Sequence, residues 1–376
     1  MPVFVLGVGA VTPLGRDWPS TRAALAAGRS GIAPVMGFDV AGFPCTVAAQ
    51  VAGELGGGDR RLALALPAAR EAWTQAGAPR GRLGVFVGAE AGRPDWRALL
   101  LLSRAKSVSA EEARALSPSV VAEQIAAALG GDGPIETLSL ACASGAVAIF
   151  EGARALRRGE CDVALCGGVG ADVEPLALAG FGLLGALSEK GRSRPFDARR
   201  DGFVVGEGAA MVVLSRAGGA VELAGAGRTL DAHQLTAPLP DGSGAARAML
   251  LALRQSGADA VQAVQAHGTS TPLNDAVEAA ALRRVLGDRL RDAHVSSVKG
   301  ALGHTIAAAG ALGFLCAVEA VASGLVLPTA GLEQPDEACA LPHVIGAAIE
   351  KRVRAALVSS FAFGGANCSL VVRRSR

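Results

Sequence analysis

The chain has 376 residues, 51% of them apolar, and a formal net charge of +2. This length suits two halves rather than one ordinary core, and the apolar content excludes a disordered chain. Because 36 basic residues are balanced by 34 acidic ones, there is no general basic field for nucleic acid, and any anionic partner has to meet a local patch. Seven cysteines without a metal-binding spacing predict reduced thiols in a cytoplasmic protein and no metal site.

The first apolar stretch, Val3 to Gly7, predicts a buried strand, because it lacks the basic flank of a signal peptide. Gly7-Val8-Gly9 resembles the start of a dinucleotide fingerprint, but Thr12 and Pro13 do not fit the rest of that motif, so NAD binding is only a weak alternative. No run of 18 or more apolar residues occurs, and we expect no membrane span.

In the first half, strands alternate with helices. Helices are expected at 20–27, 60–77, 96–103 and 120–129, and strands at 83–88, 163–166 and 203–214. The Gly-, Arg- and Ser-rich segment 180–206 is expected to be a long loop that covers something.

One stretch joins a buried strand directly to a helix, with Cys142 at the junction. Leu138 and Leu140 supply the strand, and an apolar helical period follows Cys142 as far as the stop signal at Gly159. Unpaired N–H groups and the helix dipole stabilise an anion at such a helix start, so we expect this thiol to ionise more easily than a free one. The alternative is a small cysteine used only for packing.

The second half repeats the first in outline. Strands are expected at 221–224, 260–266, 294–298, 356–360 and 368–372, and helices at 244–256, 274–286 and 307–323. This alternation predicts an α/β protein of two stacked units with mostly parallel sheets, residues 1–217 and 218–376.

Three further segments place polar groups where a buried strand ends. They are 265–275 with His267, 295–304 with Lys299 and His304, and the Gly-rich 359–367. Strand ends of this kind converge on one crevice in α/β folds, so these side chains and Cys142 are expected to form one catalytic set. The remaining histidines and cysteines have no motif around them and are expected at the surface or in packing roles.

These motifs occur together in the order found in one family. They are Ala141-Cys142-Ala143-Ser144-Gly145, Pro195-Phe196-Asp197, Arg200-Asp201-Gly202-Phe203, His267-Gly268-Thr269-Ser270-Thr271, Lys299 with Gly303-His304, and Phe363-Gly364-Gly365. From Val3 to Val372 the chain resembles the elongating type I/II β-ketoacyl-[acyl-carrier-protein] synthases, condensing enzymes of the thiolase fold. The resemblance implies duplicated βαβ halves stacked as five α-β-α-β-α layers.

The resemblance also implies a Cys-His-His mechanism. Cys142 would take an acyl chain from a carrier thioester, and malonyl-carrier protein would then bind. His267 and His304 would stabilise the enolate left by decarboxylation, and Lys299 would hold His304 in place. No cofactor is implied beyond the phosphopantetheine of the acyl carrier protein.

The surroundings of the site follow from the same resemblance. The N–H groups of Cys142 and Phe363 would form the oxyanion hole, and the gate loop would contain Phe361, Phe363 and Gly364. The residues that would contact the pantetheine arm or line the acyl pocket are Thr269, Thr271, Phe181 and Ala91. Arg60 and Arg61 would dock the acidic carrier protein, although they could equally form a solvated helix face.

Some positions depart from the family pattern. Gly313 stands where these synthases usually carry a glutamate, so ordered water or Glu90 is expected beside Lys299 instead. Ala91 replaces a bulkier pocket residue, and the segment 119–131 is short. These changes favour a specialised polyketide or polyene synthase, either a homodimer or one half of a heterodimer.

Two other function classes were weighed against this prediction. A non-catalytic, chain-length-factor-like partner would typically lack the active cysteine, whereas Cys142 and both histidines are present. A thiolase acting on coenzyme A would use a second cysteine near the C-terminus, and Cys368 does not stand in the matching motif.

Overall fold

The computed structural model describes residues 1–53, 55, 58–91 and 109–375. Its large strands join edge to edge in one ten-stranded sheet, in the order β10-β9-β13-β14-β8-β1-β7-β6-β4-β5. The two halves of the chain meet where β1 and β8 pair through Phe4–Glu222 and Val5–Val221. Two small sheets lie apart from it: β2 (Ile32–Pro34) pairs with β3 (Val47–Ala49), and β11 (Leu325–Val326) pairs with β12 (Ile349–Glu350).

Each half of the chain contributes five strands with the same topology. The first half supplies β1 (Phe4–Val11), β4 (Leu83–Ala89), β5 (Ile135–Leu138), β6 (Val163–Ala171) and β7 (Glu207–Ser215). The second half supplies β8 (Val221–Leu230), β9 (Ala263–Gln265), β10 (His294–Ser296), β13 (Ala355–Phe361) and β14 (Ala366–Arg374). Ranked along the chain, both sets have the order 3-2-4-5-1, and in each the fifth strand is antiparallel to its neighbours. The predicted duplication is therefore present strand by strand. The prediction of mostly parallel sheets is wrong, because β1, β7, β8 and β14 pair antiparallel with their neighbours.

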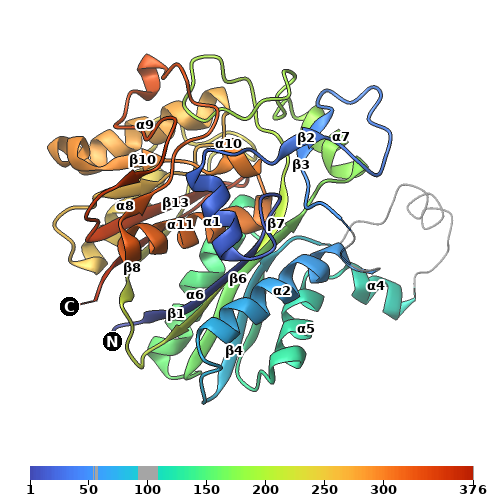
Figure 1. Ribbon diagram of the computed structural model, residues 1–376, viewed down its shortest axis with the longest axis vertical. Coiled ribbons are helices and arrows are strands. Elements are labelled where there is room, and N and C mark those ends of the chain that lie inside the picture. The colour runs from blue at the N-terminus through green and yellow to red at the C-terminus, as the bar shows by residue number, and fades with distance from the viewer. Residues whose placement is uncertain (54, 56–57, 92–108, 376) are drawn as a thin grey trace.

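The helices form the layers on either side of the strands (Figure 1). The outer helices are α2 (Arg60–Gln75) and α5 (Ser119–Leu129) on the first half, and α8 (Ser243–Ser256) and α9 (Pro272–Leu286) on the second. Between the halves lie α6 (Ser144–Arg158) and α11 (Ala309–Ser323), which pack on each other as well as on the strands. The other α-helices in the described part of the chain are α1 (Trp18–Ala26), α4 (Ala110–Leu116), α7 (Pro175–Leu183) and α10 (Lys299–Leu302). This arrangement confirms the predicted five layers.

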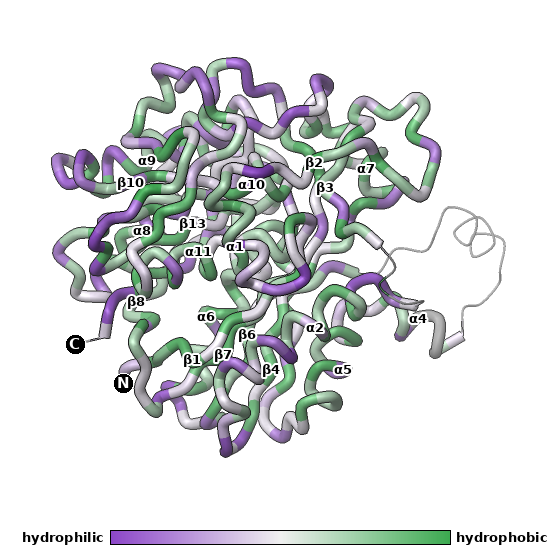
Figure 2. The backbone as a smooth tube through the Cα atoms, viewed as in Figure 1, coloured by the Kyte–Doolittle hydropathy of each residue, from purple (hydrophilic) through white to green (hydrophobic). Residues whose placement is uncertain are grey.

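Most predicted elements agree with this fold, but β6 and β8 continue further than expected, to Ala171 and Leu230, and α4 and α7 were not predicted. The helix expected at 96–103 lies outside the described residues. Gly7 and Gly9, which resembled a nucleotide fingerprint, instead allow β1 to pack on α2: a Cβ at either position would collide with the carbonyl of Ala72 or Ala68. The segment 306–323 is apolar and long enough to cross a membrane, yet 78% of it is buried inside the fold. Figure 2 shows the hydrophobic positions gathered along the strands and central helices.

The central helices approach each other through glycine. A Cβ added at Gly310 of α11 would lie 2.8 Å from Ala146 Cβ of α6 and 2.9 Å from Ser360 Oγ of β13. A Cβ at Gly145 would lie 2.7 Å from the Ala307 carbonyl oxygen. This close contact brings the N-terminal end of α6, with the preceding Cys142, against the second half of the chain.

Gly310→Ala is therefore expected to lower the free energy of unfolding by about 1–3 kcal/mol, because the methyl group overpacks a rigid contact. Gly313→Ala is the matched control on the same helix, since its Cβ would meet the flexible Gln265 side chain at 3.1 Å. We expect it to change stability by less than about 1 kcal/mol, because better helix propensity offsets mild crowding. Denaturant unfolding measures both, and equal stability of the two variants would contradict this account.

Candidate active site

A cavity of about 360 Å³ is lined by residues from both halves of the chain. Of the residues proposed from the sequence, it contains Cys142, His267, His304, Thr269, Thr271, Phe181, Phe361 and Phe363. The long loop predicted at 180–206 also contributes to the wall, through Ala186 and Phe203. Part of that segment is the end of α7 rather than loop.

Cys142 lies in a sharp turn between strand and helix. After β5 ends at Leu138, a 3₁₀ turn spans Ala141–Ala143, and α6 begins at Ser144. Ala141 has a φ of +47°, in the left-handed region that non-glycine residues rarely adopt. The Ser144 hydroxyl bridges this turn by donating to the Ala141 carbonyl at 2.7 Å and accepting from the Leu140 N–H at 2.8 Å.

A second hydroxyl reaches Cys142 from the far half of the chain. Ser360 Oγ of β13 donates to the Cys142 carbonyl at 2.9 Å, and both residues are buried. Sequence reasoning missed Ser360, which stands in the Gly-rich segment two residues before Ala362. Its side chain fixes the backbone of Cys142 against the second half.

The expectation of an easily ionised Cys142 is wrong for the resting protein. Burial raises the pKa of this thiol to about 12; Lys299 opposes the shift, and Glu90 and Asp172 add to it. Desolvation of a thiolate thus outweighs the favourable position at a helix start. Cys142 is a neutral thiol at rest, so its proton has to leave as it attacks.

The two histidines face each other across the cavity, with ring centroids 5.7 Å apart. His304 Nδ1 accepts a hydrogen bond from the Ile306 N–H at 3.2 Å, and His267 Nδ1 lies 3.3 Å from Lys299 Nζ. With both Nδ1 atoms facing donors, each ring carries its proton on Nε2. Burial, together with the Lys299 charge, lowers the pKa of both imidazoles well below 6.5. The site therefore presents two neutral N–H donors.

Lys299 supports His267 rather than His304, which corrects the prediction from the sequence. Its ammonium donates to the His267 carbonyl and contacts the Nδ1 of the same residue. Burial lowers the pKa of Lys299, and the carboxylate of Glu278 acts most strongly in the opposite direction. Glu278, which the sequence analysis did not select, also accepts hydrogen bonds from the N–H groups of His267 and Gly268, both at 2.7 Å.

The prediction that Glu90 compensates for Gly313 beside Lys299 is also wrong. Glu90 accepts hydrogen bonds from Ser139 Oγ at 3.0 Å and Ser144 Oγ at 3.3 Å, near the start of α6. The nearest side chain to a Cβ at Gly313 is Gln265. The carboxylate beside Lys299 comes instead from Glu278, on α9.

The gate loop is held by a segment that sequence analysis did not select. Gly364 and Gly365 both have positive φ, 83° and 79°, which requires glycine. Asp231 donates its N–H to the Gly365 carbonyl at 2.8 Å and accepts the Asn367 amide at 2.7 Å. Among the described residues, the N–H of Phe363 has no acceptor, so it is available to a ligand in the cavity.

The cavity walls contain both aromatic rings and polar side chains. The rings of Phe181 and Phe203 are 5.4 Å apart, and Phe203 lies 5.0 Å from His304. The hydroxyls of Thr269 and Thr271, which also line the cavity, are hydrogen-bonded at 2.9 Å. One cavity can thus bind an apolar chain through the phenylalanine rings and a polar arm through the threonine hydroxyls.

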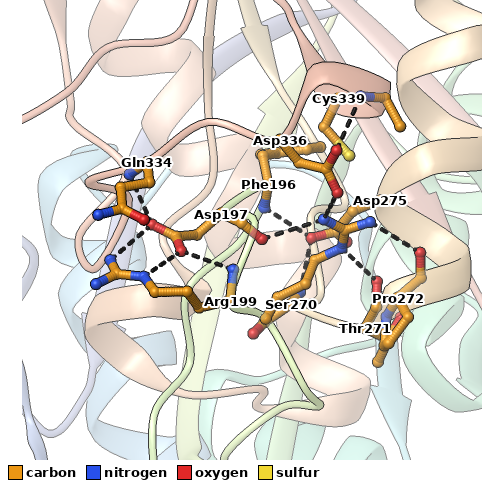
Figure 3. A network of polar contacts seen from close by, with 12 residues as sticks. Phe196, Asp197, Arg199, Ser270, Thr271, Pro272, Asp275, Gln334, Asp336 and Cys339 are labelled. Carbon is orange, nitrogen blue, oxygen red and sulfur yellow. Dashed lines mark hydrogen bonds and ion pairs between the residues drawn. The ribbon is translucent and has the colours of Figure 1, made fainter.

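A polar network supports the threonine side (Figure 3). The buried Asp275 accepts the N–H groups of Thr269 at 2.9 Å, Ser270 at 3.1 Å and Phe196 at 2.8 Å. Arg200 donates to the carbonyls of Thr271 and Pro272. These hydrogen bonds explain why the 195–203 motif and the 267–271 motif occur together. Arg200 binds backbone carbonyls at the end of the second motif and just after it, and Asp275 binds backbone N–H groups of both motifs.

Three predicted site residues lie elsewhere. Ala91, Arg60 and Arg61 line a separate cavity of about 640 Å³ and none of them lines the Cys142 cavity, which corrects the acyl-pocket role of Ala91. Arg61 is buried and donates to Asp59 and to three backbone carbonyls, so it cannot dock a partner. Arg60 is paired with the buried Glu207 at 2.5 Å.

The cysteines and His343 are enclosed by the fold to different extents. All seven cysteines are free and buried. His343 is half-buried, and its ring stacks on Phe196 at 4.8 Å, away from the cavity. Within the described ranges, no three His, Cys, Asp or Glu side chains converge in a way that would hold a metal ion.

Comparisons with known proteins match the whole fold and most of the sequence. The model of the β-ketoacyl synthase N-terminal domain matches residues 1–220, and that of the C-terminal domain matches 220–333. A curated relative, 3-oxoacyl-[acyl-carrier-protein] synthase 2 of Synechocystis sp., is 34% identical, over 99% of this chain and 98% of its own length. Among solved structures, the ishigamide ketosynthase/chain length factor has a TM-score of 0.91 at 32% identity, covering 100% of this chain and 99% of that one. A type II PKS ketosynthase in complex with its acyl-carrier protein also has a TM-score of 0.91, at 28% identity, with 100% and 99% covered.

Proposed function

The chain belongs to the β-ketoacyl synthase family, and from this premise we propose how its residues divide the reaction. The protein is an acyltransferase that condenses an acyl chain with malonyl-acyl carrier protein and releases CO2, in fatty-acid-like or polyketide chain elongation. The observation that carries the assignment of roles is the meeting of one thiol and two neutral imidazoles in a single cavity.

In the first step, Cys142 Sγ attacks the carbonyl carbon of the acyl-carrier thioester. The new thioester bond forms at Cys142, the carrier thiolate leaves, and the proton of Cys142 passes to it. The N–H groups of Cys142 and Phe363 donate to the oxyanion of the tetrahedral intermediate. The bond from Ser360 to the Cys142 carbonyl supports this step, because it keeps the turn from moving as the sulfur is acylated.

In the second step, malonyl-carrier protein binds with its thioester oxygen between the two Nε2–H groups. The bond between the malonyl α-carbon and its carboxylate breaks, CO2 leaves, and the electron pair forms an enolate. Neutral donors from His267 and His304 suit this oxyanion, since they stabilise the charge without giving up a proton. Lys299 positions His267 through Nδ1.

In the third step, the enolate carbon attacks the acyl carbonyl on Cys142. A carbon–carbon bond forms, the bond to Cys142 Sγ breaks, and the β-ketoacyl chain leaves on the carrier. The cysteine thiolate takes up a proton from water and returns to its neutral resting form. We assign the nucleophile to the half 1–217 and both histidines with Lys299 to the half 218–376.

The partners follow from the family. They are an acyl carrier protein and a second ketosynthase-like chain, as a homodimer or heterodimer. We propose that the protein works in the cytoplasm and needs no cofactor beyond the phosphopantetheine of the carrier. The presence of Cys142 supports a catalytic chain over a chain-length-factor-like subunit.

Mass spectrometry tests the proposal. Incubation with acyl-carrier protein is expected to add one acyl group, located on Cys142 by peptide mapping. Addition of malonyl-carrier protein is then expected to discharge that adduct into a β-ketoacyl-carrier product. An acyl adduct that forms but is not consumed by malonyl-carrier protein would contradict the assigned condensation.

A further inference from the structure

A further cavity, of about 460 Å³, lies where β9 and β13 begin and α8 ends. Four of its lining residues are arginines: Arg352, Arg354, Arg373 and Arg374. The one carboxylate that lines it, in the described part of the chain, is that of Asp259. Over the whole chain, basic and acidic residues nearly balance, 36 to 34, so positive charge is concentrated at this place. We call the four arginines the arginine cluster.

This cavity is remote from the active site. The strand β13 runs from Ala355, which lines this cavity, to Phe361, which lines the Cys142 cavity. Its seven residues of extended chain put about 20 Å between the two ends. In Figure 1 the C-terminus lies at the lower left, whereas α7 and α10, beside the active site, lie in the upper part of the view. A small ligand bound here does not reach Cys142.

One member of the arginine cluster has a structural role. Arg373 Nη1 donates to the Ser256 carbonyl at 2.7 Å, at the C-terminal end of α8, and its Nε donates to Glu222 at 2.9 Å. A cation suits this helix end, because the last carbonyls of a helix carry partial negative charge. The fold itself therefore accounts for Arg373.

The other three arginines have no such partner. Arg352, Arg354 and Arg374 are exposed, and within the described ranges their guanidinium groups make no hydrogen bond or ion pair with the protein. Asp259 forms no ion pair with them either. Three positive charges around one cavity are thus available to a ligand.

Two of these arginines stand opposite each other on neighbouring strands. Because β13 pairs with β14 so that Ala355 is opposite Arg373, Arg354 comes opposite Arg374, and the Arg374 N–H donates to the Arg354 carbonyl at 2.8 Å. Gln262 fixes the same point, since its Oε1 accepts the Arg354 N–H at 2.9 Å. Like charges placed opposite each other across two strands destabilise a sheet. An anion between them reverses the sign of this effect.

We propose that the arginine cluster is a binding site for phosphate groups, with Arg354 and Arg374 sharing one phosphate. Guanidinium groups match phosphate, because their forked N–H donors bind two oxygens at once. Two adjacent guanidiniums balance the two charges of one phosphate, whereas a carboxylate of an acidic protein supplies only one. Soluble oligophosphates and anionic phospholipids both carry such groups, and the experiment distinguishes these sources.

Calorimetric titration with tripolyphosphate, at constant ionic strength, tests the proposal. The unaltered protein is expected to bind one tripolyphosphate. Arg354→Gln and Arg374→Gln are each expected to weaken this binding about tenfold or more, the scale of a lost charge-assisted hydrogen bond.

Arg247→Gln is the matched control, because it removes the same charge elsewhere. Arg247 is exposed on α8, about 15 Å along the helix from the end that borders the cavity. This variant should bind tripolyphosphate as the unaltered protein does.

Two further measurements identify the source of the phosphate and check the fold. Cosedimentation with phosphatidylglycerol vesicles that is lost in Arg354→Gln assigns the site to lipid headgroups, and absence of cosedimentation assigns it to a soluble compound. Without ligand, Arg354→Gln and Arg374→Gln should unfold at no lower temperature than the unaltered protein, because each removes a contact between like charges. Condensation should be unchanged in both variants, since the cavity is remote from Cys142.

Four results would overturn the proposal. The first is an unaltered protein that does not bind tripolyphosphate, and the second is equal weakening of binding by Arg247→Gln. The third is tighter binding of a hexaglutamate peptide than of tripolyphosphate, which would point to an acidic protein partner. The fourth is a lower unfolding temperature of both cluster variants without ligand, which would show that these arginines serve the fold.

Discussion

Cys142→Ala is expected to abolish condensation and to prevent any acyl adduct, because no other group in the cavity can form the thioester. The other polar side chains that line the cavity are two imidazoles, three threonine hydroxyls, two asparagine amides and a carboxylate, and none of these replaces a thiol as the acyl carrier at neutral pH. Product formation from acyl- and malonyl-carrier protein, followed by mass spectrometry, should fall below detection.

Cys45→Ala provides the matched control. Cys45 is also buried and belongs to the same apolar cluster as Cys142, where its thiol donates to the Val47 carbonyl. This variant is expected to keep both the adduct and the product. Release of CO2 from malonyl-carrier protein should also continue in Cys142→Ala, since the histidines are intact. Elongation by Cys142→Ala would show that another residue is the nucleophile.

Substituting His267 or His304 by alanine is expected to slow CO2 release from malonyl-carrier protein by about 10²-fold or more, the scale of one lost oxyanion donor. Acylation of Cys142 should be affected much less, because its oxyanion is stabilised by backbone N–H groups. His343→Ala is a suitable control, since this ring stacks on Phe196 outside the cavity. Near-normal CO2 release in both cavity variants would remove the two residues from the mechanism.

The pH dependence of the unaltered protein tests the same roles. Burial lowers the pKa of both imidazoles well below 6.5, so the neutral N–H donors persist at pH 6.5 and above. As the pH falls through the lowered pKa values, a proton on Nδ1 would oppose the Ile306 N–H and the Lys299 ammonium, and CO2 release should then decrease. The unfolded chain takes up these protons at higher pH, so stability should also decrease below pH 6.5. A rate profile with its acid midpoint at 6.5 would contradict this interpretation.

Much of this organisation was determined by the sequence alone. The alternation of two spacings of apolar residues predicted the duplicated α/β halves. A helix buried on one face has apolar residues at intervals of three and four, whereas a strand buried on both faces is a short continuous apolar run. The placement of Cys142 between a strand and a helix, and of His267 and His304 after strand ends, followed from the same local signals. The strands before Cys142 and His267, β5 and β9, lie near opposite ends of the large sheet, and the close contact between α6 and α11 brings the two site segments together.

The partners of these side chains were decided only by the tertiary structure. Ser360 is 218 residues from the Cys142 carbonyl that it holds, and Lys299 is 32 residues from His267. Arginine is a residue type common in docking surfaces, yet Arg61 is buried and donates to the carbonyls of Ser117 and Ala115, which are far from it in the sequence. Desolvation likewise reversed the expected shift of the Cys142 pKa. The hydrogen bonds and the burial of a group depend on the atoms that surround it in the folded protein. Many of these atoms are distant in the sequence, so a local sequence pattern cannot identify them.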